Sequence, residues 1–321
     1  MEMRKLGRTG LKVAPLCFGG NVLGWTTDER TSFDVLDAYV EGGGNFVDTA
    51  DSYSRWAPGH AGGESEAVLG RWMHERGNRA RIIVATKVGN AMGDGPNDRG
   101  VSRARIMSSV EQSLRRLQTD YIDLYQAHID DRDTPLDETL RAFDDLIRQG
   151  KVRYIGASNY RAWRLATALW TSDTHGYARY ETLQPRYNLA ARDEYERELE
   201  PLCQEQGIGV ITYSSLASGF FSGKYRAGQP LPATARAQGV QRGYMNERGF
   251  ATLDAVDRIA REYGATPGQV ALAWILARPA ITAPIASATS VEQTREMLGA
   301  ADLHLSADAL AILDAASAWH S

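Results

Sequence analysis

Asp48, Tyr53, Lys87 and His128 are the residues of this chain whose types and spacing are best suited to chemistry. Three of them, Asp48, Lys87 and His128, each end a short apolar run that predicts a β-strand, and Tyr53 follows the first run. The strand ends are 39 and 41 residues apart (48 to 87, then 87 to 128). Because the carboxyl ends of successive strands in a (β/α)8 barrel meet on one face, we expect one shared site.

A phenol, an ammonium, a carboxylate and an imidazole together would make a proton donor with the groups that adjust it. An adjacent ammonium favours phenolate, so we expect Lys87 to lower the pKa of Tyr53, while Asp48 keeps Lys87 charged and oriented. His128 would donate a hydrogen bond to a carbonyl oxygen beside Tyr53. This chemistry suits reduction of a carbonyl group by hydride. The alternative is that Asp48 and Lys87 form only a structural ion pair, but four such residues near strand ends favour a functional site.

Short β-rich runs alternate with longer amphipathic runs along most of the chain, which indicates a parallel α/β architecture. We predict one domain over residues 1–321, a (β/α)8 TIM barrel with an N-terminal β-hairpin (residues 3–6 and 11–13) and an additional C-terminal helix (Ser306–Trp319). The eight expected barrel strands are Leu16–Gly19, Asn45–Asp48, Ile82–Lys87, Ile122–Gln126, Tyr154–Ser158, Thr182–Pro185, Val210–Tyr213 and Ile281–Ala286.

The stretches between the strands have helical periodicity, and Ser102 and Gly150 supply start and stop signals for helices. Two connections, residues 54–63 and 214–248, are long, and long connections in a compact domain are usually functional or mobile. Four tryptophans in helical patterns are expected to pack: Trp72, Trp163, Trp170 and Trp274. The expected helices include Thr31–Glu41, Ser102–Leu117, Leu136–Gln149 and Arg192–Glu205.

Composition places the chain among ordinary globular proteins, with 43% apolar and 24% charged residues. The net charge of −4 gives no general reason to expect a nucleic-acid partner. No apolar core follows the first five residues, and Val270–Ala277, the longest apolar stretch, is too short to cross a bilayer. We therefore expect a cytoplasmic protein with no signal peptide and no membrane partner, and no residue pattern specifies an oligomeric state. Cys17 and Cys203 are expected to be buried thiols.

The sequence lacks the common motifs for nucleotides and metals. No G-x-G-x-x-G follows a strand, so the usual dinucleotide fingerprint is absent. The segment 219–224 superficially resembles a phosphate loop, but it is too short and is followed by Tyr225 where Ser or Thr is needed. There is no H-x-H pair and no cysteine cluster, so no metal site is expected. The remaining histidines are scattered and expected at the surface.

Longer phrases around the four residues resemble motifs of the aldo-keto reductase family over essentially the whole chain. The phrases are Arg4–Gly7 with Leu11–Val13, Phe46–Tyr53, Ala85–Lys87, Gly156–Asn159, Gln184–Asn188 and Gly223–Tyr225. The resemblance implies a barrel that binds NADPH, less often NADH, in extended form without a Rossmann fold. It also implies that Tyr53 is the general acid in reversible reduction of aldehydes or ketones, with Lys87 and Asp48 tuning it. His128 would orient the substrate.

The resemblance further implies where a nicotinamide cofactor would lie. Ser158, Asn159 and Gln184 match positions that hold the carboxamide, and their hydroxyl and amide groups suit that task. Tyr213 matches the aromatic on which the nicotinamide ring stacks, although a packing role at the barrel mouth is the alternative. Gly20 and Asn21 match the turn near the nicotinamide ribose. The loop over the pyrophosphate is matched by Ser214, Leu216, Ser218, Gly219 and Lys224, the last of which could instead be a solvated charge.

The adenosine end departs from the family pattern. Ser287 stands where Gly or Lys is usual, Thr289 where Arg is common, and Met297 where Asn is common. A 2′-phosphate usually takes a bidentate guanidinium, and Arg295 is the nearby cation in the sequence. NADPH is the expected cofactor, with NADH or dual use open. The candidate residues at this end are Ser287, Thr289, Ser290, Gln293 and Glu296.

Trp25 and Trp56 lie on segments expected above the site. Aromatic walls would suit a carbohydrate-like, cyclic or aromatic small molecule carrying a carbonyl or alcohol, although both residues could simply anchor loops. The family resemblance also leaves a second function open, because potassium-channel β-subunits share this barrel. That alternative is a cofactor-binding regulatory subunit.

Overall fold

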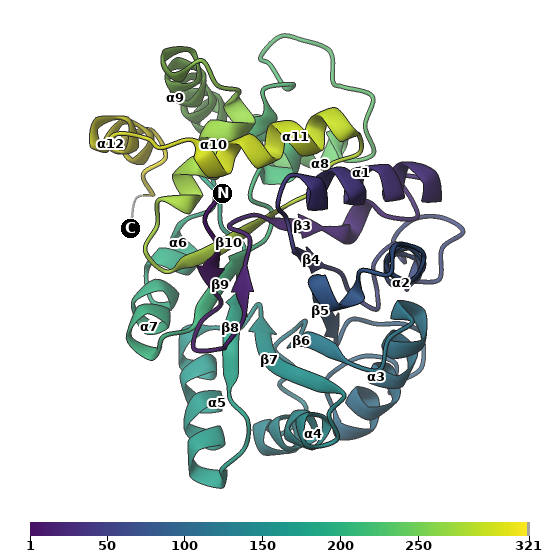
Figure 1. The fold of residues 1–321 in the computed structure, drawn as a ribbon. Helices are drawn as coiled ribbons and strands as arrows, with labels where there is room; N and C mark the ends of the chain where they lie inside the picture. The colour runs from purple at the N-terminus through teal and green to yellow at the C-terminus, as the bar shows by residue number, and fades with distance from the viewer. Residues whose placement is uncertain (320–321) are drawn as a thin grey trace.

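The computed structural model describes residues 1–319 and contains a closed barrel of eight parallel strands (Figure 1). Each strand pairs with the next one along the chain, and β9 pairs with β10, which pairs with β3 to close the barrel. This order confirms the predicted (β/α)8 fold. The strands are β3 (Cys17–Gly19), β4 (Phe46–Asp48), β5 (Ile83–Val88), β6 (Ile122–Ala127), β7 (Val152–Ser158), β8 (Tyr180–Gln184), β9 (Gly209–Thr212) and β10 (Ile281–Ala286).

Helices surround the barrel and cover its outer face (Figure 1). Ser102 caps its helix as predicted, since its side chain accepts a hydrogen bond from the backbone N–H of Arg105. The helices are α1 (Glu29–Glu41), α2 (Glu64–Arg76), α3 (Arg103–Leu117), α4 (Leu136–Arg148), α5 (Ala162–His175), α6 (Asp193–Glu196), α7 (Leu199–Gln206), α8 (Ala237–Tyr244), α9 (Glu247–Tyr263), α10 (Pro267–Leu276), α11 (Val291–Gly299) and α12 (Ala307–Ala316).

The single helix predicted over Arg192–Glu205 is wrong, because the segment forms two helices, α6 and α7. Pro201 is the third residue of α7 and has no N–H to donate to the carbonyl four residues earlier. A proline is tolerated in the first turn of a helix but not in its interior, so the chain begins a new helix here. The long connection over 214–248 is also more ordered than expected, with the 3-10 helix η3 (Ala217–Ser222) and α8.

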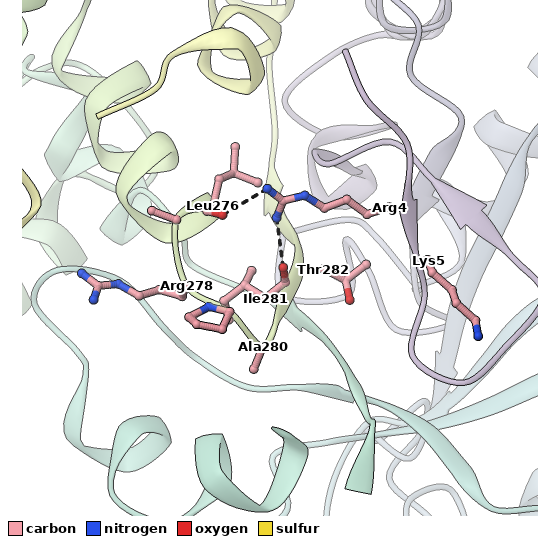
Figure 2. A pocket seen from close by; sticks show the side chains of 9 residues that line it. Arg4, Lys5, Leu276, Arg278, Ala280, Ile281 and Thr282 are labelled. Carbon is pink, nitrogen blue, oxygen red and sulfur yellow. Dashed lines mark hydrogen bonds between the residues drawn. The ribbon is translucent and has the colours of Figure 1, made fainter. Parts of the chain in front are cut away.

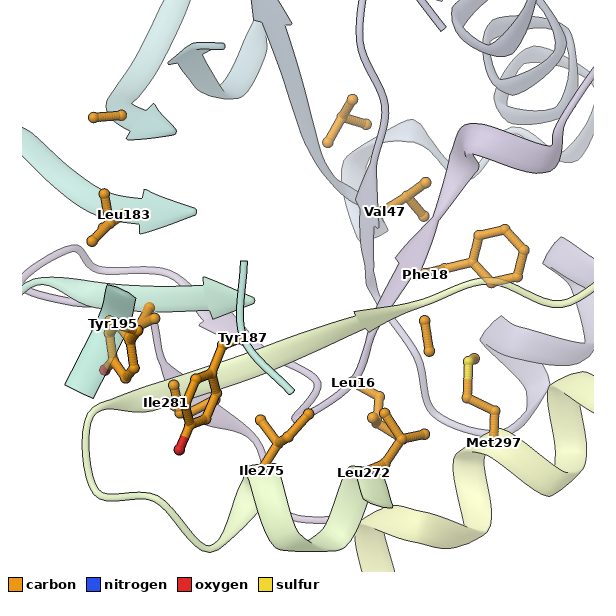
Figure 3. Packing of buried hydrophobic residues seen from close by; sticks show 14 of the residues in the cluster. Leu16, Phe18, Val47, Leu183, Tyr187, Tyr195, Leu272, Ile275, Ile281 and Met297 are labelled. Carbon is orange, nitrogen blue, oxygen red and sulfur yellow. The ribbon is translucent and has the colours of Figure 1, made fainter. Parts of the chain in front are cut away.

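Strand periodicity divides the core into two layers, because successive side chains point to opposite faces. Cys17 and Phe46 lie in the cluster inside the barrel, while Phe18 and Val47, one residue further along, belong to the larger cluster under the helices. Figure 3 shows this outer layer. Asp48 has the same parity as Phe46, so the strand directs its side chain toward the barrel axis.

The predicted N-terminal hairpin is present as β1 (Arg4–Lys5) and β2 (Lys12–Val13), and its Leu6 and Val13 belong to the cluster inside the barrel. Gly7 approaches the starts of two strands so closely that an added Cβ would lie 2.4 Å from the Glu181 carbonyl oxygen. Arg4 fastens the hairpin, because its guanidinium donates to the carbonyls of Leu276 at 3.1 Å and Ile281 at 3.0 Å (Figure 2). The hairpin is thereby joined to the end of α10 and the start of β10.

We expect Arg4→Met to lower the free energy of unfolding by about 2 kcal/mol, because it keeps the apolar stem but removes two charge-assisted hydrogen bonds. Urea denaturation at neutral pH would measure the loss. Lys5→Met is the matched control, since the neighbouring Lys5 is exposed and its removal is expected to change stability by less than about 0.5 kcal/mol. Equal stability of Arg4→Met and the wild type would show that these bonds add nothing.

The aromatic and thiol predictions have mixed outcomes. Trp72 and Trp274 are fully buried, as predicted, but Trp163 and Trp170 on α5 are 54% and 67% exposed, so their predicted packing role is wrong. Helical periodicity shows on which face of a helix a residue lies, but it does not show whether other residues cover an aromatic side chain at the edge of that face.

Cys17 and Cys203 are both buried and not disulfide-bonded, as predicted. Within residues 1–319, every helix is too short or too polar to span a bilayer.

Candidate active site

The carboxyl ends of β4, β5 and β6 bring Asp48, Lys87 and His128 together. Asp48 is the last residue of β4, Lys87 is the last but one of β5, and His128 directly follows β6. Asp48 and Lys87 are both fully buried, and the Lys87 Nζ lies 2.6 Å from the Asp48 Oδ2. Burying two unpaired charges would be strongly unfavourable, so each stabilises the charged form of the other.

Lys87 uses all three of its N–H donors within this site. They reach Asp48 Oδ2, the Thr49 carbonyl oxygen at 2.8 Å and the Tyr53 hydroxyl at 2.8 Å. The other oxygen of Asp48 accepts from the side-chain amides of Gln184 at 2.8 Å and Gln126 at 3.4 Å. These hydrogen bonds fix the Lys87 ammonium in contact with the Tyr53 hydroxyl.

Tyr53 is held in the turn that follows β4, where its hydroxyl donates to Asp48 Oδ2 at 3.0 Å. Burial and the Asp48 carboxylate raise the pKa of Tyr53 well above its ordinary value. This direction is opposite to the predicted lowering, because Asp48 shares the charge of Lys87 and itself disfavours a phenolate. Tyr53 is therefore a neutral phenol at neutral pH and carries a proton that it can donate.

His128 is partly buried beside Tyr53, with ring centroids 6.1 Å apart. Burial and the nearby Lys87 ammonium lower the pKa of His128 well below its ordinary value. Its imidazole is therefore neutral at neutral pH. A neutral imidazole carries one N–H and can act as a hydrogen-bond donor without becoming a competing acid.

A cavity of about 990 Å³ opens above these groups, which is near the upper end of the usual range for ligand pockets. Tyr53 and His128 line it, while Asp48 and Lys87 lie behind Tyr53. Most of the residues predicted at the nicotinamide and pyrophosphate positions line it too: Asn21, Ser158, Asn159, Gln184, Tyr213, Ser214, Leu216, Ser218, Gly219 and Lys224. Ser287, Thr289, Gln293 and Glu296 line it from the segment after β10.

Besides Asp48 and Lys87, three predicted site residues lie outside this lining. Gly20 is replaced there by its neighbour Gly19, and its own carbonyl accepts from Ser65 Oγ at 2.7 Å. Ser290 caps α11 by accepting from the Gln293 N–H. Trp25 lies behind Trp56, with ring centroids 5.5 Å apart in an edge-to-face arrangement.

Trp56 forms part of the cavity wall and is 53% exposed. Its ring contacts Tyr53 at 5.8 Å between centroids and Trp25 on its other side. A chain of aromatic rings thus leads from the cavity mouth to the phenol. Edge-to-face contacts of this kind hold a ring in one orientation, which makes Trp56 a firm apolar surface for a bound molecule.

Tyr213 and Asn159 are joined at the cavity wall. The Tyr213 hydroxyl donates to Asn159 Oδ1 at 2.8 Å, and Asn159 Nδ2 donates to the His128 carbonyl at 2.9 Å. Asn159 adopts φ of +61°, a backbone conformation that asparagine tolerates better than most residues. The contact links the end of β9 to the loops after β6 and β7.

Two functional candidates, Arg236 and Asn90, were missed by sequence reasoning. Arg236 lines the cavity and, like Lys224, has no carboxylate partner among residues 1–319. Burial lowers the pKa of both side chains. The predicted cation Arg295 is exposed and does not line the cavity. Arg236 lies in the long connection, where no periodicity indicates the direction of a side chain.

A second charged cluster lies behind the Tyr53 turn. Asp51 is 1% exposed and accepts from Arg105 at 3.2 Å, and the fully buried Glu66 accepts from Arg116 at 2.7 Å. Burial, followed by repulsion from Glu66, raises the pKa of Asp51 to about 7, against the opposing effect of Arg105 and Arg116. The folded protein therefore binds a proton here more tightly than the unfolded chain.

The raised pKa of Asp51 predicts that part of the free energy of unfolding is lost as pH rises from about 4 to about 7, since the ordinary pKa of an aspartate is about 3.9. Asp51→Asn should remove that slope and be more stable than the wild type at pH 8, by about 1–4 kcal/mol. Urea denaturation across this pH range is the measurement. The exposed Asp133→Asn is the control and should keep the slope. An unchanged slope in Asp51→Asn would contradict the prediction.

Comparison with known proteins identifies relatives of the whole barrel. A model described as the aldo/keto reductase family matches residues 15–318. An uncharacterized oxidoreductase, YrpG, of Bacillus subtilis is 39% identical over 98% of this chain and 95% of its own length. A probable voltage-gated potassium channel subunit beta of Arabidopsis thaliana is 35% identical over 94% of this chain and 92% of its own.

A third relative, norsolorinic acid reductase of Aspergillus flavus, is 31% identical over 95% of this chain and 78% of its own length. These matches and the family model extend over nearly the whole barrel, including every strand that carries a candidate site residue. The chain therefore belongs to the aldo/keto reductase family.

Proposed function

We propose that this protein reduces aldehydes or ketones with NADPH or NADH, and catalyses the reverse oxidation of the alcohol. The observation that carries the proposal is the hydroxyl of Tyr53, which contacts the Lys87 ammonium at 2.8 Å at the edge of a large cavity. A proton donor backed by a fixed cation is what a carbonyl oxygen needs as it becomes an alcohol.

The cavity's residues fit a dinucleotide. Ser158, Asn159 and Gln184 offer hydroxyl and amide groups for a carboxamide, and Tyr213 offers a flat ring beside them. Lys224 and Arg236 are two cations without carboxylate partners among the described residues, which suits a diphosphate. When bound, such a cofactor would supply the hydride that the carbonyl carbon receives.

The chain's own residues would handle the oxygen of the substrate. His128 would donate its N–H to the carbonyl oxygen and orient the carbonyl, and Tyr53 would transfer its proton as negative charge develops there. Lys87 would stabilise the phenolate that remains, and Asp48 would keep Lys87 charged and in place. The carbon gains a hydride and the oxygen gains a proton, so the product is the alcohol.

Cofactor choice depends on the segment after β10, which lines the cavity with the neutral Ser287, Thr289 and Gln293 and with the acidic Glu296. Ser287 Oγ donates to Asn21 Oδ1 at 2.6 Å, and Thr289 donates to Gln293 Oε1 at 3.1 Å. These groups can bind either a ribose hydroxyl or a phosphate. We propose NADPH as the cofactor on the family resemblance. NADH should be an accepted substitute, because the cations that line this cavity, Lys224 and Arg236, lie between η3 and α8 rather than on α11, where a 2′-phosphate would need one.

We propose that the substrates are cyclic or aromatic carbonyl compounds. The firm aromatic surface of Trp56, supported by Trp25, offers stacking area directly beside Tyr53. The relative named norsolorinic acid reductase supports a reductase activity for this barrel. Trp56→Ala should then raise KM for aromatic carbonyls more than for short aliphatic aldehydes.

Fluorescence titration with NADPH and NADH, followed by a panel of carbonyl compounds monitored at the absorbance of the reduced cofactor, tests the proposal. We expect saturable binding of at least one cofactor and consumption of it with several carbonyls. Failure of both cofactors to bind would overturn the proposal.

A regulatory subunit is the second candidate, favoured by the relative named as a potassium channel subunit beta. It predicts tight cofactor binding with negligible turnover and a stable protein partner. Rapid turnover of simple aldehydes by the isolated chain would favour the enzyme.

A further inference from the structure

Asn90 lies two residues beyond the end of β5 and lines the cavity beside His128. Its side-chain nitrogen is 3.1 Å from His128 Nδ1 and 3.4 Å from Ser52 Oγ. The backbones are also joined, because the His128 N–H donates to the Val88 carbonyl at 2.8 Å. One amide therefore connects the imidazole with the turn that carries Tyr53.

This contact fixes the location of the imidazole proton. A side-chain amide nitrogen can only donate hydrogen bonds, so His128 Nδ1 must accept and has no proton of its own. The proton of the neutral ring is then on Nε2. Within residues 1–319, Nε2 has no hydrogen-bond partner, and His128 lines the cavity. The one available N–H of the ring is thus free to bind a ligand.

The groups around the His128 ring leave it with a single proton. Lys87 on β5 opposes a second proton, and Tyr53 faces the ring from the turn after β4 as a neutral phenol. The acidic residues that follow on the same loop are engaged elsewhere, since Asp130 accepts from Arg164 at 2.8 Å and Asp131 from Thr134 at 2.7 Å. With one proton on the ring, its position determines whether His128 donates to a ligand or accepts from it.

We propose that Asn90 is a positioning residue that holds the imidazole proton of His128 on Nε2 and so makes this nitrogen the hydrogen-bond donor to the substrate oxygen. The proposal rests on the proposed carbonyl reduction for its consequence in catalysis. Its structural content, the tautomer of His128, can be measured without any turnover. Failure of the proposed tautomer can therefore be distinguished from failure of the proposed carbonyl reduction.

Nitrogen-15 NMR of the full chain labelled at histidine tests the tautomer, with the His128 signals identified by their loss in His128→Gln. We expect Nδ1 at the shift of an unprotonated ring nitrogen and Nε2 at that of an N–H, at neutral pH and without ligand. Asn90→Leu should give a mixture of the two tautomers. A wild-type protein with the proton on Nδ1 would overturn the proposal.

Kinetics of Asn90→Asp give a second, independent test. A carboxylate accepts a proton from Nδ1, so it should raise the pKa of His128 and, once the ring is neutral, leave Nε2 without hydrogen. Turnover of this variant should fall about a hundredfold from its own value at acidic pH as pH rises through the new pKa, as when an oxyanion donor is lost. Affinity for the cofactor alone should not change.

Asn97→Asp is the matched control, because Asn97 is exposed on the same loop and receives the same change of charge. It should keep the wild-type pH profile. A profile of Asn90→Asp that matches that of Asn97→Asp would overturn the proposal. If Asn90 variants do not fold, the tautomer of His128 measured in the wild type still decides whether the proposal holds. A wild type with the expected tautomer but no turnover would refute the proposed function alone.

Discussion

Tyr53→Phe is expected to lower the turnover number for carbonyl reduction by at least about a hundredfold, the lower end of general-acid contributions. A hundredfold loss corresponds to about 2.7 kcal/mol of transition-state stabilisation. The variant removes only the hydroxyl that contacts Lys87 at 2.8 Å and Asp48 at 3.0 Å. The ring, with its contacts to Trp56 and His128, would remain.

Steady-state kinetics with saturating cofactor would measure this loss, and the dissociation constant of the cofactor should remain as in the wild type. Tyr154→Phe is the matched control, since its hydroxyl accepts from the Gly10 N–H at 3.2 Å at the opposite end of the barrel. It should reduce carbonyls at the wild-type rate. Near-wild-type reduction by Tyr53→Phe would remove Tyr53 from the mechanism.

Lys87→Met should abolish most activity and also lower the free energy of unfolding by about 3–5 kcal/mol. The reason for the second effect is that Asp48, fully buried, would lose the cation at 2.6 Å and remain as an uncompensated charge. Activity should fall because the phenolate of Tyr53 would lose its stabilising ammonium. Urea denaturation and steady-state kinetics would measure the two losses.

The double variant Lys87→Met with Asp48→Asn separates the two effects. Removing both charges relieves the penalty of a buried unpaired carboxylate, so much of the lost stability should return. Activity should not return with it, because the ammonium is still missing. Recovery of both in the double variant would mean that Lys87 acts only as a structural counter-ion.

The strand ends of the site could be predicted from the sequence because barrel geometry converts a position along the chain into a position in space. Asp48 and Lys87 share parity with inward residues of their strands, and this alternation is visible in the sequence. The break before α7 was also visible in principle, since Pro201 lies inside the expected helix. A proline at this position outweighs the amphipathic periodicity of the segment.

Other features depend on contacts that sequence patterns do not contain. Arg236 enters the cavity from an irregular connection, and Asn90 meets His128 only because β5 and β6 are neighbours. The direction of the Tyr53 pKa shift was predicted wrongly, because it depends on how Asp48 divides the charge of Lys87 and on burial. These are consequences of distances of about 3 Å between residues far apart in the chain.

Transfer of deuterium to the product, from a reduced cofactor deuterated at both C4 positions of the nicotinamide, is the most direct test of hydride transfer to a carbonyl with Tyr53 as the acid. With an aromatic aldehyde as substrate, we expect an alcohol that carries one deuterium on the carbon of the former carbonyl group. The same label should appear far more slowly with Tyr53→Phe. An unlabelled alcohol, or labelling at the wild-type rate in that variant, would show that the site does not perform this reaction.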